Sequence, residues 1–317
     1  MNILITGIRG TIGSFLAQKL STEHTVYGLD HITDSIMGVE QVFTCTEFSA
    51  IPEVDVVVHL AGRSSDTMDM EKSLEYIENN VGLTQCVYEW FRKSNAKQFY
   101  YFSSIKVLGD RSDNALLTEE LEPHPFGPLG ESKYLAEKFI QEHWTADKKA
   151  YIMRTALLHG KGLFFNQNAK LLLRSVLKGR PYIFGSFECK RSLTSLDNLA
   201  AVLTQMMRQD VSSGIYHLTD DDAITSSEFY RLMGKALNKN VRVWKLGKKV
   251  FWLVALVMEL TNGRFNRFEY RRLSLNFVAS NAKLKKALGM ESMPFKLRES
   301  LIQSIREYTA QIEQVSK

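Results

Sequence analysis

Short apolar runs alternate with amphipathic stretches along the first half of the chain. Asn2–Thr6 is an apolar run bounded by glycine, and it predicts a buried strand. Further apolar runs predict strands at 24–29, 54–60, 98–103 and 150–155. Helical spacing of apolar residues predicts helices after Phe15, over 70–91 and over 129–143. Strands that alternate with helices indicate an α/β fold with a doubly wound parallel sheet.

The pattern loosens after about residue 157. It predicts helices over 168–178, over 197–207 with Asp197 as the cap, over 228–237 and over 301–312, and a strand over 215–218. We therefore expect a larger domain over 1–165 and a smaller, C-terminal substrate-binding domain over 166–317. Part of 189–219 is expected to return to the first domain.

A glycine-rich turn follows the first predicted strand and leads directly into a helix. Its sequence is Gly7-Ile8-Arg9-Gly10-Thr11-Ile12-Gly13. Glycines at this place permit a tight turn and close approach of a pyrophosphate, while the helix N-terminus attracts negative charge. Asp30 ends the second predicted strand, where a carboxylate can accept the ribose hydroxyls of a dinucleotide. The expected cofactor contacts in this part of the chain are Gly7, Arg9, Gly10, Thr11, Ile12, Gly13, Asp30 and His31.

The carboxylate of Asp30 would repel a 2′-phosphate, so the pattern favours NAD over NADP. Arg9 and His31 leave NADP open, because either side chain can carry a positive charge.

Composition indicates a globular intracellular protein. The chain has 317 residues, 44% of them hydrophobic, and a net charge of +5, which suits a phosphorylated ligand without calling for nucleic acid. Cys45, Cys86 and Cys189 are widely spaced, which argues against a disulfide framework or a metal site. The longest apolar run, 250–258, is too short for a membrane span, and a core strand starts the chain without a signal peptide. We expect a cytoplasmic location.

Four further segments complete a family pattern: His59-Leu60-Ala61-Gly62, Asn79-Asn80-Val81, Ser103-Ser104-Ile105-Lys106-Val107-Leu108-Gly109 and Gly130-Glu131-Ser132-Lys133-Tyr134-Leu135-Ala136-Glu137. In this order the chain resembles the extended short-chain dehydrogenases/reductases of the NAD-dependent sugar-nucleotide epimerase/dehydratase type. The resemblance implies a Rossmann-type domain, NAD as cofactor and a nucleoside-diphosphate sugar, most simply a UDP-sugar, as substrate. It adds Leu60, Ala61, Gly62, Asn80 and Lys133 to the expected cofactor contacts.

The resemblance also implies a catalytic serine, tyrosine and lysine, and here the chain departs from the family. Ser104 and Lys133 occupy their expected places, but Leu129 stands at the tyrosine position. A lysine four residues after a tyrosine shares its helix face and favours the phenolate, which can then accept a proton from the sugar. Leucine cannot exchange a proton.

Other groups are candidates for the missing proton carrier. Tyr134 and Lys138 repeat the tyrosine–lysine spacing, although five residues along a helix turn a side chain by about 140°. Glu131, His124 or a bound water are further candidates. Lys133 can also bind ribose hydroxyls in a protein without catalytic activity.

Substrate contacts are expected from Ser104 and from three residues in the second half of the chain. Arg191 resembles the family's arginine that binds a diphosphate, for which a guanidinium offers two parallel hydrogen bonds. Phe165 and Asn166 fall where the family binds the nucleotide base or sugar.

The family does not explain the apolar run 250–258. It is flanked by Arg242, Lys245, Lys248, Lys249, Arg264, Arg267, Arg271 and Arg272. One interpretation is a buried helix with solvated ends. The other is a basic-rimmed apolar patch that rests on an anionic membrane surface or on a partner that handles lipid-linked sugars. A further alternative is that one or two of Arg267, Arg271 and Arg272 reach the substrate diphosphate.

Taken together, the residues and the resemblance predict an NAD-dependent epimerase acting at C4 of a nucleoside-diphosphate sugar in the synthesis of cell-surface glycan precursors. A sugar-nucleotide reductase or dehydratase is the alternative enzyme. A pseudo-enzyme that binds NAD as a sensor or subunit is the alternative from another class. A homodimer is compatible with the resemblance, and no sequence feature indicates nucleic-acid binding.

Overall fold

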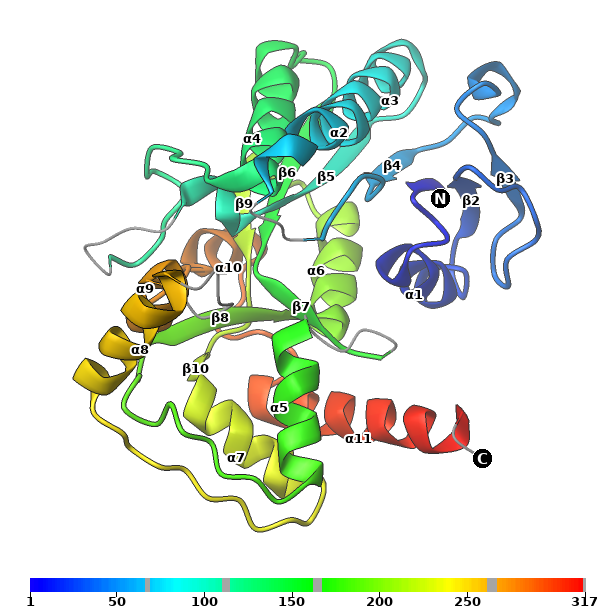
Figure 1. Cartoon of the computed structure of the whole chain (residues 1–317). Helices are drawn as coiled ribbons and strands as arrows, with labels where there is room; N and C mark the ends of the chain where they lie inside the picture. The colour runs from blue at the N-terminus through cyan, green and yellow to red at the C-terminus, as the bar shows by residue number, and fades with distance from the viewer. Residues whose placement is uncertain (66–68, 110–114, 162–166, 261–266, 316–317) are drawn as a thin grey trace.

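In the computed structural model of the protein, a seven-stranded parallel sheet forms the larger half of the molecule. The structure describes residues 1–65, 69–109, 115–161, 167–260 and 267–315. The strand order is β3-β2-β1-β4-β5-β6-β9. The strands are β1 (Asn2–Thr6), β2 (Thr25–Leu29), β3 (Gln41–Phe43), β4 (Val56–His59), β5 (Gln98–Ser104), β6 (Lys149–Thr155) and β9 (Gly214–Leu218). The predicted α/β fold class is confirmed (Figure 1).

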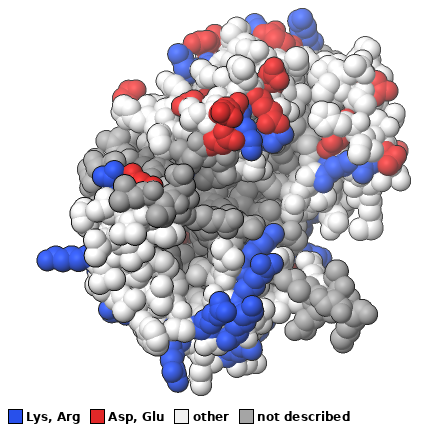
Figure 2. All heavy atoms as spheres, in the orientation of Figure 1, with Lys and Arg blue, Asp and Glu red and all other residues white. Residues whose placement is uncertain are grey.

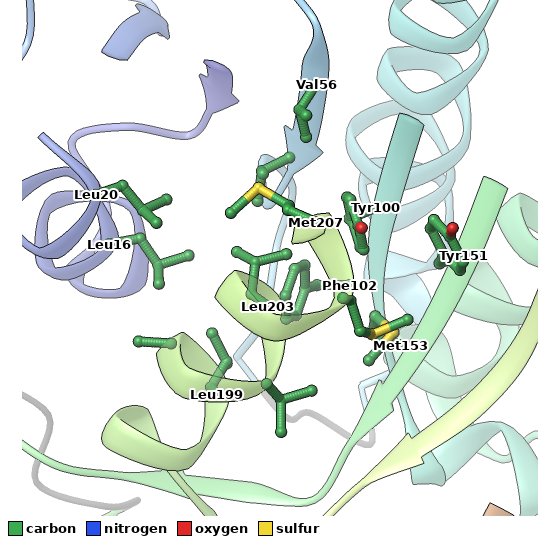
Figure 3. Close-up of a cluster of buried hydrophobic side chains, with 14 of the residues drawn as sticks. Leu16, Leu20, Val56, Tyr100, Phe102, Tyr151, Met153, Leu199, Leu203 and Met207 are labelled. Carbon is green, nitrogen blue, oxygen red and sulfur yellow. The ribbon is translucent and has the colours of Figure 1, made fainter. Parts of the chain in front are cut away.

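One face of this sheet is covered by helices from both halves of the chain. They are α1 (Thr11–Leu20), α6 (Leu196–Arg208) and α10 (Ala282–Leu288). Figure 3 shows Leu16 and Leu20 of α1 and Leu199, Leu203 and Met207 of α6 lying over side chains of the central strands. Burial of each large apolar side chain contributes roughly 1.5–3 kcal/mol, so this cluster ties the second half of the chain to the first.

The opposite face is covered by helices that precede and follow β5. They are α3 (Leu83–Lys93) and α4 (Gly127–Glu142), with the shorter α2 (Ser73–Ile77) before them. Alternate residues of the strands point to this side, as Leu4, Val57 and Tyr101 do, and they pack against Tyr88 and Ile140. Both faces of the sheet are thus buried, which explains the nearly continuous apolar runs in the sequence.

The second half of the chain builds a smaller sheet and a helical layer. The strands are β7 (Leu157–His159), β8 (Lys190–Ser195) and β10 (Ala223–Thr225), in the order β10-β8-β7. The helices are α5 (Gln167–Leu177), α7 (Ser226–Ala236), α8 (Lys248–Leu260), α9 (Arg267–Ser274) and α11 (Leu297–Val315). β9 and α6 belong to the large sheet and its cover, whereas β8 belongs to the small sheet. The domain boundary near residue 165 stays a prediction.

The long helix expected over 70–91 is present, with a π-helical segment, Glu78–Gly82, joining α2 to α3. Two other local expectations differ from the structure. Asp197 does not cap α6: Ser195 is the cap, and its side chain accepts from the backbone N–H of Asn198. The helix at 250–258 is not buried, since only Phe251 and Ala255 of this run are. The interpretation of this run as a buried helix is therefore wrong.

Candidate active site

The glycine-rich turn forms a compact cradle between β1 and α1. Gly7 has a φ of +68°, and a Cβ there would lie 2.9 Å from the backbone of Ala61. The N–H of Gly10 donates to the carbonyl of Gly7 at 3.0 Å. A Cβ on Gly13 would lie 2.3 Å from the same carbonyl, so α1 packs directly on the turn. Gly10 precedes α1 and gives it no side-chain cap, so the turn leaves the first amides of the helix to a ligand.

Asp30 lies beside this cradle, immediately after β2. Its Oδ2 accepts the backbone N–H of Arg9 at 3.0 Å, and its Oδ1 accepts that of His31 at 2.8 Å. These bonds fix the carboxylate at the mouth of the glycine turn, and each oxygen keeps a lone pair for a further donor. Nε of Arg9 donates to the carbonyl of Ile32 at 2.9 Å, so this guanidinium holds the loop after β2.

A buried hydrogen-bond chain supports the turn from behind. Oγ1 of Thr84 lies 2.5 Å from the carbonyl of Asn80 and 2.9 Å from Nε2 of His59. Because the single hydroxyl proton of Thr84 goes to that carbonyl, Nε2 of His59 is the donor to Thr84. Nδ1 of His59 is then an acceptor for Oγ1 of Thr6 at 2.6 Å, and Thr6 accepts from the N–H of Ala61 at 3.1 Å.

The histidine in this chain is held neutral. Burial, with a smaller contribution from the positive charge of Lys133, lowers the pKa of His59 to about 3. A neutral ring is required for the acceptor at Nδ1, so the pKa and the geometry agree.

Asn80 holds the loop after β4 against α4. Its Oδ1 accepts the N–H of Arg63 at 2.7 Å, and its Nδ2 donates to the carbonyl of Arg63 at 3.1 Å. The same Nδ2 donates to Oγ of Ser132 at 2.8 Å. Gly62 is needed here because it has a φ of +132° and a Cβ would lie 2.3 Å from Oδ1 of Asn80. Asn80 therefore positions Leu60–Gly62, and its predicted cofactor contact stays a prediction.

Ser104 and Lys133 are brought to the same end of β5. Ser104 is the last residue of this strand, and its Oγ accepts the N–H of Lys106 at 3.2 Å. Nζ of Lys133 donates to the carbonyl of Phe102 at 2.9 Å, two residues before Ser104, and lies 4.9 Å from the ring centroid of Tyr101. Burial lowers the pKa of Lys133 to about 8, against the opposing charge of Glu137.

Leu129 lies one helical turn before Lys133 and is buried. Tyr134 instead packs in a cluster that includes Val107, Leu117 and Ala279, while Lys138 is exposed. The structure thus does not join Tyr134 and Lys138 into a pair beside Lys133. Among the other candidate proton carriers, Glu131 is half-buried and His124 is exposed.

A buried ion pair beneath α4 was not expected from the sequence. Arg154 of β6 binds Glu137 through Nε at 3.0 Å and through Nη2 at 2.7 Å, and the two side chains are 2% and 0% exposed. Oγ of Ser103 also donates to this carboxylate. The signal in the sequence was the position of Glu137, four residues after Lys133 and so on the same face of α4. The ion pair fixes this face against β5 and β6.

Of the substrate candidates, only Arg191 and Ser104 lie within the described residues. Arg191 lies in β8 opposite Ile224, next to the bridge with Phe277, and is half-buried. Phe165 and Asn166 lie outside the described residues.

The sequence that forms this site matches a known protein family. The model of the NAD dependent epimerase/dehydratase family matches residues 3–218, which include the glycine turn, Asp30, Ser104 and Lys133. The chain belongs to this family. It is therefore a sugar-nucleotide epimerase/dehydratase-type enzyme with NAD as its cofactor, as the resemblance implied.

Members of the epimerase/dehydratase family match most of the chain. UDP-glucose 4-epimerase of Vibrio cholerae is 28% identical over 284 residues, covering 82% of this chain and 85% of that protein. dTDP-glucose 4,6-dehydratase of Haemophilus influenzae is 23% identical over 220 residues, covering 57% of this chain and 63% of that protein.

Solved structures share the fold. The UDP-glucuronic acid 4-epimerase from Bacillus cereus in complex with NAD superposes with a TM-score of 0.75 at 19% identity, covering 97% of this chain and 96% of that one. The UDP-glucose 4-epimerase of Thermotoga maritima with UDP-glucose gives 0.75 at 19%, covering 98% and 100%.

The residues of the cradle fit the family's dinucleotide. A helix without a side-chain cap, a glycine turn that a Cβ would fill, and a carboxylate fixed beside them are the features that a pyrophosphate and an adenosine ribose require. NAD supplies the hydride acceptor and donor when it is bound.

Proposed function

We propose that the protein is a 4-epimerase of a nucleoside-diphosphate sugar, most simply a UDP-sugar, in the synthesis of cell-surface glycan precursors. One observation carries the proposal. Ser104 and Lys133 lie at the carboxyl end of β5, and the glycine turn follows the carboxyl end of β1 in the same parallel sheet. The similarity of the chain to UDP-glucose 4-epimerase of Vibrio cholerae, over 82% of its length, supports the same reaction.

Each part of the site that matches the family pattern has a task in this reaction. The α1 N-terminus and Gly7, Gly10 and Gly13 bind the pyrophosphate, and Asp30 accepts the ribose hydroxyls. Lys133 donates to the ribose next to the nicotinamide, and Ser104 holds the sugar hydroxyl from which a proton must leave. Arg191 neutralises the diphosphate of the substrate.

Leu129 separates this enzyme from the family's usual proton relay. A leucine one turn before Lys133 has no atom that can accept or donate a proton, so another group has to receive the proton of the sugar hydroxyl. We propose a water, held between Ser104 and the neutral amine of Lys133, which takes that proton as it gives one of its own to Nζ. A pKa of about 8 for Lys133 suits a group that exchanges protons near neutral pH.

A sugar-nucleotide dehydratase or reductase is the second candidate. The similarity to a dTDP-glucose 4,6-dehydratase favours it, because both reactions begin with the same oxidation at C4. The two differ in whether the keto-sugar is returned to an alcohol at C4 or altered elsewhere in the ring.

The test combines binding with product analysis. Purified protein is first denatured and the released small molecules are identified by mass spectrometry, with NAD and a UDP-sugar expected. The protein is then incubated with UDP-glucose, UDP-glucuronic acid and UDP-N-acetylglucosamine in deuterated water, and the products are examined by NMR. Inversion at C4 supports the epimerase, whereas loss of water supports the dehydratase. Tight binding of NAD and a UDP-sugar with no conversion would contradict the proposal and favour a sensor or subunit.

A further inference from the structure

α8 exposes an unbroken aliphatic stripe. Val250, Leu253, Val254 and Val257 recur at helical spacing, lie within an arc of about 100° and are each 43–57% exposed. The opposite side of the helix packs on the protein: the ring of Phe251 lies 4.6 Å from that of Phe184 and 5.4 Å from that of Phe187. The stripe is thus presented outward by a helix that is anchored from behind.

Other apolar side chains near the stripe in the sequence are exposed but are not part of it. Trp244 and Leu246 precede α8, and Trp252 projects from another side of this helix, about 150° from the centre of the stripe. We call Val250, Leu253, Val254 and Val257 the α8 patch. Isolated exposed apolar side chains need no explanation, but a group of this size on one short segment does.

The charge around the α8 patch is positive. Residues 239–260 contain Lys239, Arg242, Lys245, Lys248 and Lys249 but a single acidic residue, Glu259. Glu259 is already paired with Arg267 at 2.6 Å. Lys245 is paired with Glu188 at 3.0 Å, and Nζ of Lys248 lies 5.8 Å from the ring centroid of Phe187, on the side of α8 that packs on the protein. Lys249, in the first turn of α8, is the cation that lies beside the stripe. In Figure 2 the surface over α8, at the left of the view, is almost entirely uncharged, with a basic side chain projecting beside it.

We propose that the α8 patch docks the enzyme on an anionic membrane surface. The aliphatic stripe enters the boundary between headgroups and acyl chains, and Lys249, beside the stripe, contacts lipid phosphates. None of the helices in the described part of the chain is long and apolar enough to cross a bilayer, so the contact is peripheral.

The composition of the patch favours a lipid surface over a protein partner. Lysine is depleted in protein–protein interfaces, whereas lysine beside an aliphatic stripe is typical of helices that lie in a membrane interface. The proposal does not depend on the reaction at Ser104 and Lys133, since it needs no sugar nucleotide.

Vesicle flotation tests the proposal with the full-length protein. We expect the protein to float with vesicles of phosphatidylcholine mixed with phosphatidylglycerol, and not with vesicles of phosphatidylcholine alone. Leu253→Asp should weaken the binding at least about tenfold, because it places a carboxylate in the stripe. Leu74→Asp is the matched control, since Leu74 is 73% exposed on α2, away from the patch. It should bind like the parent protein.

A charge variant completes the test. Lys249→Ala should weaken binding about fivefold, the contribution of one cation near an anionic surface. Val250→Ser is a second variant of the aliphatic stripe and should also weaken binding. Circular dichroism and NAD binding establish that each variant is folded.

Three results would overturn the proposal. The first is recovery of the parent protein without lipid from the flotation with anionic vesicles, and the second is flotation of both Leu253→Asp and Val250→Ser as efficient as that of the parent. A dimer in light scattering that Leu253→Asp converts to a monomer, without vesicle binding by the parent, would assign the α8 patch to a second copy of the chain.

Discussion

Asn80 donates to Ser132 across the site, with 2.8 Å between Nδ2 and Oγ. This bond joins the loop after β4 to α4, the helix that carries both Lys133 and Leu129. Since Asn80 also holds both backbone groups of Arg63, one amide sets the position of two walls of the proposed cofactor site.

Replacing this amide should therefore cost stability as well as cofactor affinity. Asn80→Ala leaves the N–H of Arg63 and the hydroxyl of Ser132 without this partner in a buried setting, which typically costs about 1–3 kcal/mol. Denaturant unfolding measures the loss, and calorimetry measures weaker NAD binding. Asn79→Ala is the matched control, because Asn79 donates within its own helical segment, to the carbonyl of Glu75, and its replacement should change stability little.

Asp30 should select the dinucleotide. We expect NAD to raise the melting temperature more than NADP does, because the carboxylate accepts from the free ribose hydroxyls and repels a 2′-phosphate. Asp30→Ala should weaken NAD binding and reduce the preference for NAD over NADP. Asp34→Ala, in the same loop, should leave this preference unchanged. Equal protection of the parent protein by both dinucleotides would refute the assignment.

Arg191 should contribute to binding of the substrate diphosphate. Arg191→Ala removes a charge-assisted hydrogen bond, each worth roughly 1.5–3 kcal/mol, so UDP should bind about 10–100-fold more weakly. NAD affinity should be unchanged. The neighbouring Lys190 is exposed, and Lys190→Ala should have a small effect on both ligands. UDP affinity that is the same in Arg191→Ala and the parent protein would remove Arg191 from the site.

Leu129→Tyr restores the phenol that the family uses. If the remaining site is arranged for it, activity on a UDP-sugar should rise by roughly 10²–10⁴-fold, the usual contribution of a general acid–base group. Leu129→Phe adds the ring without the hydroxyl and should give no gain, while Tyr134→Phe should leave activity unchanged. A slower Leu129→Tyr enzyme would show that the leucine belongs to a different proton route. Loss of activity in Tyr134→Phe, with NAD binding intact, would move the base to Tyr134.

Two buried histidines should make the fold sensitive to acid. Burial lowers the pKa of both His59 and His217 to about 3, whereas a histidine in the unfolded chain titrates near 6.5. The unfolded state therefore binds more protons between these values, so the stability contributed above pH 6.5 is lost as the pH falls toward 3. Unfolding free energies measured across this window should give a slope that drops by close to one proton in His217→Gln. An unchanged slope would mean that His217 is already charged in the fold.

The sequence was sufficient for the parts of the site that depend on local backbone. The spacing of Gly7, Gly10 and Gly13 leads directly to a turn and a helix start, and Asp30 follows from the end of a strand. Sequence motifs identified Lys133 and Ser104, and in the structure both residues lie at the carboxyl end of β5.

Contacts between distant segments could not be predicted in the same way. The pairing of Glu137 with Arg154 joins α4 to β6, and neither residue is unusual in its own segment. The role of Asn80 as a brace depends on Ser132, 52 residues later. The exposure of α8 could not be decided from the sequence either, because the same apolar run fits a buried helix unless the segments packed against it are known.

β9 has a consequence for how the molecule is made. This strand completes the large sheet beside β6, and α6 and α10 complete its cover, although all three follow the small sheet's first strand in the chain. A nascent chain that has only reached residue 165 would hold the whole glycine turn and yet leave Tyr100, Phe102 and Met153 without the helix that buries them. We expect the cofactor half to mature late in synthesis, after α10 has left the ribosome, so that a truncated product is cleared by proteolysis and not retained as a stable NAD-binding fragment.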